Sequence, residues 1–258
     1  MKTAFISGAT SGIGLALARQ LHEQGYNLIL HGRDQNRLNQ LQASLNGATL
    51  TISADLSTST GLKHLLTELS QYPDRIDVAI NNAGFGLYGQ HLSLNEIEVD
   101  AMLHLNMVAV TKLSRFFAEL MVRQGQGYIM NVASTAAYQP QPYMAAYAAS
   151  KAYVASITES LAVEMKDQNV TVTCLSPGRT DTAFFTFDGQ DSSKSGKGTF
   201  AGKNRTSPEQ VATLGLKAMF SGKLREIPLC ENKFYIFLNR ILPRTMVLKI
   251  YHQAMRNI

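Results

Sequence analysis

Short apolar runs alternate with longer segments of helical periodicity along most of this chain of 258 residues. The runs have the length and the β-branched content of strands. The expected strands are Thr3–Ser7, Asn27–His31, Thr49–Ala54, Asp77–Ile80, Gly127–Val132 and Val170–Leu175. The segments between them are long enough for helices, and one carries leucines near a 3.6-residue period, at Leu62, Leu65, Leu66 and Leu69. Because strands this apolar are covered on both faces, the pattern predicts a parallel sheet between two layers of helices.

Right-handed crossovers between such strands give an α/β, Rossmann-like, doubly wound fold, in which ligands bind beyond the carboxyl ends of the strands. The length fits one large domain, which we expect at residues 1–222. Residues 223–258 carry seven Lys or Arg against two Glu, whereas the rest of the chain carries 17 basic and 17 acidic residues. The basic charge therefore marks a helical C-terminal extension and does not indicate a nucleic-acid partner.

The composition is ordinary for a globular protein, with 45% hydrophobic and 17% charged residues. No apolar run reaches the ~18–20 residues of a membrane span, and no secretory segment precedes Ser7. Cys174 and Cys230 both stand beside apolar residues, so we expect buried free thiols rather than a disulfide. These features predict a cytoplasmic protein, and we expect no metal site.

The first predicted strand runs into a glycine-rich turn, Ser7-Gly8-Ala9-Thr10-Ser11-Gly12-Ile13-Gly14, followed by a predicted helix over Leu15–Gln24. Glycines permit a tight turn and close approach of the backbone to a ligand. The free N–H groups and the positive dipole end of a helix start suit a pyrophosphate. A glycine turn alone is weak evidence, but its place between the first strand and the first helix favours a dinucleotide site. We expect cofactor contacts from Gly8, Thr10, Ser11, Gly12, Ile13 and Gly14.

The end of the second predicted strand bears on the choice of cofactor. An NAD site usually has a carboxylate there for the ribose 2′-hydroxyl, but this chain reads His31-Gly32-Arg33-Asp34. Gly32 stands where the acid is expected, and the Arg33 guanidinium can grip a 2′-phosphate. We therefore expect NADP(H), with a plain surface charge as the alternative role of Arg33. Asp34 precedes a helical pattern and is expected to cap that helix.

Tyr147 and Lys151 stand four residues apart in a stretch of good helix formers, which places both side chains on one helix face. A free phenol titrates near ~10 and is a poor base at neutral pH. We expect the Lys151 ammonium to lower the pKa of Tyr147 and make the phenol a usable acid or base for a carbinol oxygen. Ser134, just past the strand Gly127–Val132, can hydrogen-bond to the same oxygen. The tyrosine–lysine spacing is common by chance and gains weight only beside the glycine turn.

Together these motifs resemble the single-domain branch of the short-chain dehydrogenase/reductase family, over about residues 3–222. Asn81-Asn82-Ala83-Gly84, after the fourth predicted strand, and Pro177-Gly178, after the sixth, belong to the same resemblance. Asn106 stands where the family has its fourth catalytic residue. The motifs follow one another in the order and at the spacing typical of the family.

The resemblance implies a role for each residue. Tyr147 would donate or accept the proton, Ser134 would polarise the carbonyl, and Lys151 would hold the nicotinamide ribose and lower the pKa of Tyr147. Asn106 would position a water for proton relay, and a satisfied buried amide is its alternative role. The implied cofactor contacts are adenine at Asp55 and Leu56, the adenosine ribose at Asn82, the nicotinamide carboxamide at Thr180 and Thr182, and neighbouring positions at Ala83, Gly84, Pro177 and Gly178. Asn81 is expected to support the sheet.

Two segments after Pro177 differ from the regular strand and helix pattern. Thr180 replaces the Val or Ile that family members often carry, and Arg179 and Asp181 add charge near the expected nicotinamide pocket. Residues 186–206 are rich in Gly, Ser, Lys and Asp without an apolar period, which fits either an exposed loop or a lid over the substrate. Thr206-Ser207-Pro208-Glu209 then predicts the start of a helix.

The C-terminal extension carries two helical patterns, at Phe234–Leu242 and Thr245–Arg256. The first places apolar residues at helical spacing, at Phe234, Phe237, Leu238, Ile241 and Leu242. We expect this face to pack on its own domain or between copies, which would make the protein a homo-oligomer. Attachment to an anionic membrane surface is the alternative.

These features predict an enzyme that transfers a hydride between NADP(H) and a carbonyl compound or secondary alcohol. The pocket walls are expected at Phe85–His91, Ala136–Met144 and 183–205. Their aromatic residues and methionine favour a small apolar substrate, and they include Tyr138, Tyr143, Met144, Phe184, Phe185 and Phe187. A non-catalytic NADP-sensing protein on the same fold is the alternative, although such proteins typically lose the tyrosine or the lysine. An epimerase or dehydratase of the extended branch would need room for a substrate domain, and only about 80 residues follow Pro177.

Overall fold

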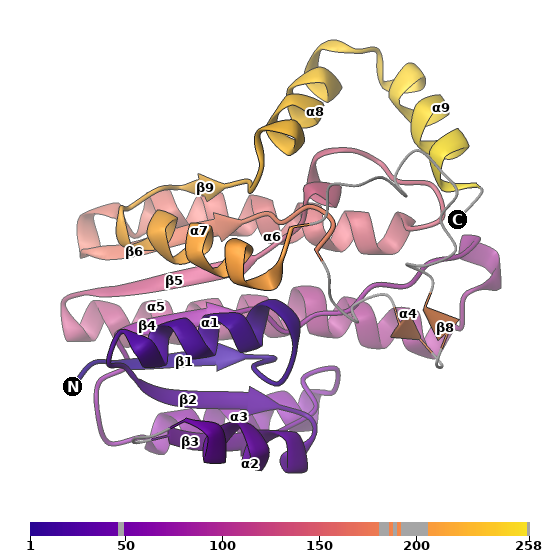
Figure 1. Ribbon diagram of the computed structural model, residues 1–258. Helices are drawn as coiled ribbons and strands as arrows, with labels where there is room; N and C mark the ends of the chain where they lie inside the picture. The colour runs from indigo at the N-terminus through magenta and orange to yellow at the C-terminus, as the bar shows by residue number, and fades with distance from the viewer. Residues whose placement is uncertain (46–48, 181–185, 188–189, 192–205, 257–258) are drawn as a thin grey trace.

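The computed structural model describes residues 1–45, 49–180, 186–187, 190–191 and 206–256 (Figure 1). In chain order its strands and α-helices are β1 (Thr3–Ser7), α1 (Gly12–Glu23), β2 (Asn27–Gly32), α2 (Gln35–Ser44), β3 (Thr49–Ser53), α3 (Ser59–Gln71), β4 (Val78–Asn81), α4 (Glu96–Leu103), α5 (Val110–Gln124), β5 (Gly127–Val132), α6 (Ala145–Glu164), β6 (Val170–Leu175), β7 (Thr186–Phe187), β8 (Gln190–Asp191), α7 (Pro208–Phe220), β9 (Arg225–Glu226), α8 (Cys230–Ile241) and α9 (Arg244–Met255). Shorter helical turns are η1 (His91–Ser93), η2 (His104–Ala109), η3 (Thr135–Tyr138) and η4 (Lys166–Gln168).

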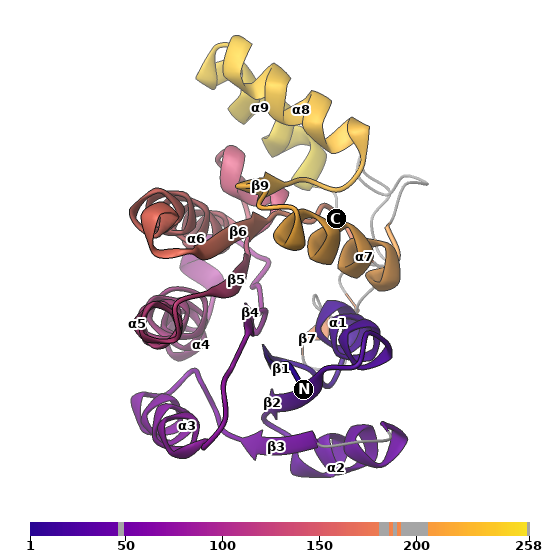
Figure 2. The ribbon, with the colours of Figure 1, turned by 90° about the vertical axis from the view of Figure 1, so that its left-hand side faces the viewer.

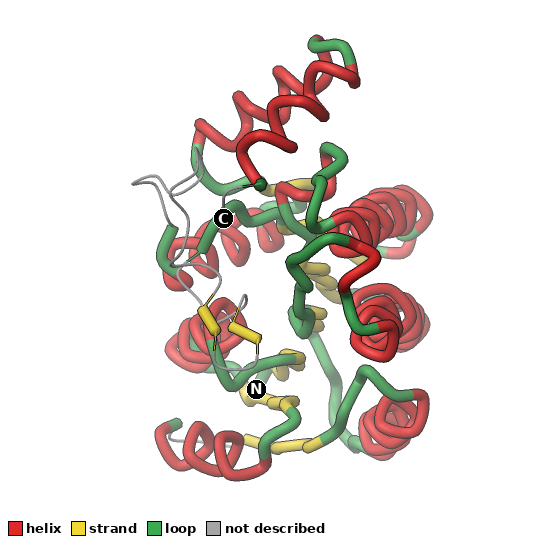
Figure 3. The backbone as a smooth tube through the Cα atoms, turned by 90° about the vertical axis from the view of Figure 1, so that its right-hand side faces the viewer, coloured by secondary structure: helices red, strands yellow, loops and turns green. Residues whose placement is uncertain are grey.

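One parallel sheet of seven strands, in the order β3-β2-β1-β4-β5-β6-β9, forms the centre of the protein. β1 lies between β2 and β4, so the chain winds outward from β1 in both directions. This is the predicted α/β, Rossmann-like fold. The strands end at a common carboxyl edge, and Figure 3 looks onto this edge, where connecting loops gather.

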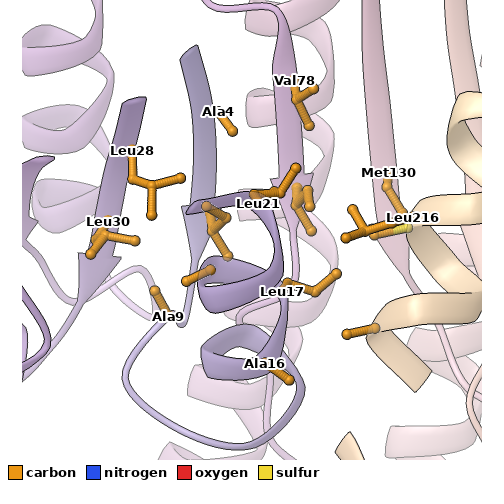
Figure 4. Packing of buried hydrophobic residues seen from close by; sticks show 14 of the residues in the cluster. Ala4, Ala9, Ala16, Leu17, Leu21, Leu28, Leu30, Val78, Met130 and Leu216 are labelled. Carbon is orange, nitrogen blue, oxygen red and sulfur yellow. The ribbon is translucent and has the colours of Figure 1, made fainter. Parts of the chain in front are cut away.

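Two layers of helices cover the sheet, with α1, α2 and α7 on one face and α3, α5 and α6 on the other (Figure 2). Alternate side chains of a strand enter different cores. Ile6 of β1 belongs to the core under α1 and α7, whereas Phe5 belongs to the core under α3 and α5, with its ring centroid 5.0 Å from that of Phe117. Leu17 and Leu21 project from α1 into the first core (Figure 4), and both are 0% exposed.

Strand bounds agree closely with the sequence pattern. β1, β5 and β6 begin and end at the predicted residues, and the other three predicted strands differ by one residue at one or both ends. β9 escaped prediction because two residues carry no periodicity. It pairs with β6 and carries the sheet past residue 222, and the division of the chain at that point stays a prediction.

Helix starts follow the capping rules. The Asp34 side chain accepts from the N–H groups of Asn36 and Arg37 at the start of α2, as predicted. Ser207 caps α7 through a reciprocal capping box with Gln210, which confirms the predicted helix start. α1 begins at Gly12 rather than Leu15, because the last glycines of the turn already belong to the first turn of the helix.

The segment predicted as a loop or lid, residues 186–206, contains a pair of short strands. β7 and β8 run antiparallel, and Thr206 forms a bridge with Thr180. Positions 181–185, 188–189 and 192–205 lie outside the described residues, and with them Thr182. The lid therefore stays a prediction.

The extension departs from the sheet: α8 runs away from it and α9 returns towards the carboxyl edge (Figure 1). α8 buries Ile236, but Phe234, Phe237 and Ile241 are 58%, 57% and 63% exposed. These three side chains are therefore not covered by the described part of their own domain, and the packing of the extension on the domain stays a prediction. The interface between copies stays a prediction.

Both cysteines are free thiols; Cys174 is buried and Cys230 is exposed. Burial is thus confirmed for Cys174 and wrong for Cys230, which begins the projecting helix α8. Throughout the described part of the chain, every helix is too short or too polar to cross a membrane.

Candidate functional site

The turn between β1 and α1 lies at the carboxyl edge and is shaped by its glycines. Gly8 has φ +66° and Gly12 has φ +52°, a conformation that strains other residues. A Cβ on Gly14 would lie 2.1 Å from the Gly8 carbonyl oxygen, so only glycine lets α1 begin this close to the turn. The Ser11 side chain makes no capping hydrogen bond at this helix start. N–H groups of α1 are therefore left to bind an anionic group.

Two polar side chains brace the glycine turn against β4. The Asn82 amide donates to the carbonyls of Ser7 and Gly8, at 3.0 and 3.2 Å. The Ser7 hydroxyl oxygen accepts from the N–H groups of Asn82 and Ala83, both at 3.0 Å. Asn82 therefore fixes the shape of the turn, in addition to the ribose contact that the family resemblance implies.

His31, which the sequence analysis left without a role, supports the same turn from β2. Its ring Nε2 lies 3.0 Å from the Ala54 carbonyl oxygen, and the Gly8 N–H donates to Nδ1 at 3.4 Å. A neutral ring with its proton on Nε2 satisfies both contacts. Burial lowers the pKa of His31 to about 4, so the ring is neutral at physiological pH. The sequence signal for this role is a histidine in an apolar strand that ends beside the glycine turn.

The end of β2 lies close to the side chain of Thr10. A Cβ on Gly32 would lie 2.9 Å from the Thr10 methyl carbon. Arg33 is exposed and has no ion-pair partner among the described residues. The neighbouring Asp34 carboxylate instead pairs with Arg37, at 3.4 Å. An exposed guanidinium therefore follows β2, at the strand end where a fold of this type binds the nucleotide ribose.

The two residues expected to flank adenine differ in exposure. Asp55 is exposed at the end of β3, where its carboxylate accepts from the N–H and hydroxyl of Ser57, at 3.0 and 2.7 Å. The Leu56 side chain is 1% exposed and packs in the core under α3 and α5. Any adenine contact at Leu56 would therefore come from its main chain.

The predicted catalytic side chains lie together at the carboxyl edge. Tyr147 and Lys151 of α6 are 5% and 3% exposed. Ser134 follows β5, accepts from the Ala136 N–H at 3.1 Å and hydrogen-bonds to the Tyr147 hydroxyl. The Lys151 ammonium lies 6.0 Å from the centroid of the Tyr147 ring and donates to the Val132 carbonyl at 2.9 Å.

Asn106 joins this group through the π-helical turn η2. A Cβ on Gly84 would lie 3.0 Å from the Asn106 Oδ1 and 3.3 Å from the Lys151 Nζ, so both side chains converge on Gly84. The Asn106 Nδ2 donates to the Phe85 carbonyl at 3.0 Å and to the Ser150 hydroxyl at 3.1 Å. Its amide is thus buried and hydrogen-bonded, as the alternative role requires, and it also lies beside Lys151.

Burial moves the pKa of both proton-active side chains. It raises the pKa of Tyr147 to about 12, and the hydrogen bond with Ser134 opposes this shift in part. It lowers the pKa of Lys151 to about 8. The expected lowering of the Tyr147 pKa is therefore wrong in net direction, because desolvation of the phenolate outweighs the stabilising contacts. The phenol keeps its proton at neutral pH.

Residues of the third expected contact segment follow β6. The Pro177 carbonyl accepts from the Thr135 N–H at 2.9 Å, which ties the segment to the residue after Ser134. A Cβ on Gly178 would lie 2.5 Å from the Asn232 Nδ2 of α8, so this glycine allows α8 to approach. The Thr180 hydroxyl donates to the Gly178 carbonyl at 3.2 Å.

Asn81, next to the site in sequence, has the supporting role expected of it. Its Nδ2 donates to the Ser114 hydroxyl at 3.2 Å and to the Asn131 Oδ1 at 2.8 Å, in a buried network between β4, β5 and α5.

Comparison with known proteins finds relatives that match most of the chain. The family model described as short chain dehydrogenase matches residues 2–192. An uncharacterised oxidoreductase of Staphylococcus epidermidis is 33% identical over 181 residues, which cover 70% of this chain and 79% of that protein. The Bos taurus dehydrogenase/reductase SDR family member 4 is 30% identical over 217 residues, which cover 82% of this chain and 78% of that protein.

Solved structures agree over nearly the whole chain. A short-chain dehydrogenase from Sphingobium yanoikuyae in complex with NADPH superposes with a TM-score of 0.82 at 26% identity, covering 96% of this chain and 94% of its own. A bulky-bulky ketone specific alcohol dehydrogenase from Comamonas testosteroni superposes with a TM-score of 0.78 at 26% identity, covering 93% of this chain and 92% of its own. With the glycine turn and the serine, tyrosine and lysine in place, the chain belongs to the short-chain dehydrogenase/reductase family.

Proposed function

We propose that this protein is an NADP(H)-dependent oxidoreductase that interconverts an apolar carbonyl compound and its secondary alcohol, with Tyr147 as general acid and base. One observation carries the proposal: the half-buried Ser134 meets the buried Tyr147 and Lys151 beside Gly84 and Asn106. A non-catalytic sensor would have no need of a phenol whose hydroxyl is oriented by a serine.

The side chains divide the proton chemistry between them. The Tyr147 hydroxyl holds its proton at neutral pH, because burial raises its pKa to about 12, and the protonated phenol is the form that carbonyl reduction needs. The Ser134 hydroxyl, bonded to Tyr147, orients the same substrate oxygen. Lys151, held by the Val132 carbonyl, places a cation behind the phenol. When bound, the nicotinamide supplies or removes the hydride.

The carboxyl edge fits a dinucleotide cofactor in shape and charge. The start of α1, where Ser11 leaves N–H groups uncapped, suits the pyrophosphate. Arg33 would bind the 2′-phosphate of NADP, and Gly32 supplies no carboxylate of the kind that an NAD site uses at this point. The proposed contacts further along the chain are Asp55, Leu56, Asn82, Ala83, Gly84, Tyr147, Lys151, Pro177, Gly178, Thr180 and Thr182.

The named relatives support the same class of cofactor and substrate. The Sphingobium protein was solved with NADPH, and the Comamonas protein is described as specific for bulky-bulky ketones. Free thiols at Cys174 and Cys230 agree with the reducing cytoplasm in which we expect the protein to act. The exposed apolar face of α8 supports a homo-oligomer.

Substituting Tyr147→Phe tests the proposed chemistry. Loss of the hydroxyl should lower kcat for carbonyl reduction by about 10²–10⁴-fold, the usual contribution of a positioned acid. The Kd of NADPH should change little, because the ring remains. Turnover follows from NADPH absorbance with a panel of ketones and aldehydes, and the Kd from fluorescence titration.

Tyr153→Phe is the matched control, since Tyr153 lies on the same helix but is 36% exposed and hydrogen-bonds to Thr111. It should keep wild-type turnover. The proposed chemistry fails if Tyr147→Phe turns over as fast as wild type, or if the wild type reduces no member of the panel with either nicotinamide cofactor.

Substituting Arg33→Ala tests the cofactor preference. The Kd of NADPH should rise by at least about tenfold, as expected for the loss of a charge-assisted contact of roughly 1.5–3 kcal/mol, and the Kd of NADH should stay the same. Arg37→Ala removes another exposed arginine, four residues further along the chain, and it should weaken neither cofactor. Equal losses for NADPH and NADH in Arg33→Ala would contradict a role in reading the 2′-phosphate.

A further inference from the structure

The last turn of α9 reaches the site, although it lies over a hundred residues from Tyr147 in sequence. Met255 is 7% exposed and belongs to the same apolar cluster as Tyr147. Residues of that cluster come from five separate parts of the chain, and they include Leu87, Met102, Ala136 and Met144. The last turn of α9 is therefore part of the apolar cluster that contains the catalytic phenol.

Two aromatic residues hold α9 in this place. The Tyr88 hydroxyl donates to the Met255 carbonyl. The Tyr143 ring stacks on His252 of α9, with centroids 5.7 Å apart and planes 15° apart, and on Tyr88, with centroids 6.1 Å apart. Both tyrosines lie in the segments expected to wall the substrate pocket, so α9 is attached directly to that wall.

The backbone of Tyr143, whose ring contacts His252, has an unusual conformation. Tyr143 has φ +66°, a left-handed conformation that is rare for an aromatic residue. Its carbonyl accepts from the Gly89 N–H at 2.8 Å, which joins the two wall segments. Strained conformations of this kind persist where the surroundings hold them, and they gather at ligand sites.

We propose that the last turn of α9, through His252 and Met255, forms one wall of the substrate site and sets the size of the apolar group that is accepted beside the carbonyl. The inference rests on the proposed function and extends it to substrate selection. An imidazole face and a flexible thioether, together with Tyr88 and Tyr143, line a site for a flat or branched hydrocarbon group. Carbonyl compounds with such a group are the substrate class that this wall would select.

Met255→Ala tests the wall in the full-length protein. We would measure kcat/KM with NADPH for a series of phenyl alkyl ketones whose alkyl group grows from methyl to hexyl. Shortening the side chain should raise the ratio of kcat/KM for the largest ketone over the smallest by about tenfold or more, as expected for one or two methylenes in an apolar pocket. Met255→Trp should move the same ratio in the opposite direction.

Gln253→Ala and Lys249→Ala are the controls, because both residues are exposed on the same helix. They should leave the ratio at the wild-type value. Tyr88→Phe removes the hydroxyl that holds Met255, and it should broaden the size preference without a change in the thermal midpoint beyond that of the controls.

The outcomes separate this inference from the proposed function. A wild type that reduces the ketones, with a size ratio unchanged in Met255→Ala, Met255→Trp and Tyr88→Phe, overturns the role of α9 and leaves the proposed function standing. A wild type that reduces none of the series or of the broader panel overturns both.

Discussion

Helices α1 and α8 carry similar apolar faces but lie in different surroundings. α1 buries Leu17 and Leu21 completely against the sheet, beside Leu216 of α7 (Figure 4). α8 leaves Phe234, Phe237 and Ile241 more than half exposed. The comparison teaches that helical periodicity identifies an apolar face, while topology decides what covers it. A sheet strand lies under α1, whereas no strand or helix of the described part of the chain covers the outer side of α8.

The largest expected effect of this difference is on folding stability. Leu17→Ala should lower the free energy of unfolding by about 2–5 kcal/mol, because it removes a fully buried side chain and leaves a cavity. Phe237→Ala should change it by less than about 0.5 kcal/mol, since more than half of that side chain is already exposed. Urea unfolding of both variants measures the two values. Equal losses would contradict the exposed position of Phe237.

A second expected effect concerns acid. The folded-state pKa of His31 is about 4, and an unfolded histidine titrates near ~6.5. The unfolded chain therefore binds more protons between these values, so the stability that neutral His31 provides is complete above pH ~6.5 and is lost as the pH falls towards 4. The loss should amount to about 3 kcal/mol.

His31→Gln keeps a side-chain N–H for the Ala54 carbonyl and removes the titration. Unfolding from pH 7 to pH 4 should therefore show a smaller loss of stability in His31→Gln than in wild type. His64→Gln, at an exposed helical position, should follow the wild type. Amide exchange would sharpen the comparison between the regions: acid should loosen β1 and β2 before it affects α8, and the reverse order would contradict it.

Substitution of the exposed Phe237 should have the smallest effect on folding stability, but it should change the oligomeric state. Phe237→Ser should fold as well as wild type, but it should shift the protein from a dimer to a monomer if a second copy covers α8. Light scattering during size-exclusion chromatography measures the mass. Leu92→Ser is the control, since Leu92 is 99% exposed and lies in η1, away from α8.

Three outcomes would show that the exposed face of α8 is not an interface between copies of the protein. A wild-type dimer that survives Phe237→Ser would place the interface elsewhere. A monomeric wild type would contradict the homo-oligomer. Co-flotation of the wild type with anionic vesicles at low salt, lost in Phe237→Ser, would favour the membrane surface as the partner of α8 instead.

Local chemistry made much of the fold and site predictable from sequence. The strands β1, β5 and β6 follow from runs of apolar residues, and the caps of α2 and α7 follow from Asp34 and Ser207. Ser134 lies just past β5 and Tyr147 lies in the first turn of α6, the next long helix after that strand, so the chain brings both residues to the carboxyl edge.

Long-range geometry was not predictable in the same way. The return of α9 to Tyr88 and Tyr143 depends on the path of the chain after β9, which no periodicity encodes. The direction of the Tyr147 pKa shift depends on how deeply α6 is buried, because desolvation competes with every favourable contact of the phenolate. The neutral state of His31 has the same origin.

The π-helical turn η2 has a consequence for how the site tolerates insertions and deletions. Between α4 and α5 the helix has a wider turn at His104–Ala109, and Asn106 lies within it. Each residue of an α-helix turns the chain by about 100°, so deleting one residue here would restore a regular α-helix while rotating Asn106 away from the Phe85 carbonyl. The position of Asn106 therefore depends on the irregular turn. A deletion that makes the helix more regular would move the Asn106 amide away from Lys151.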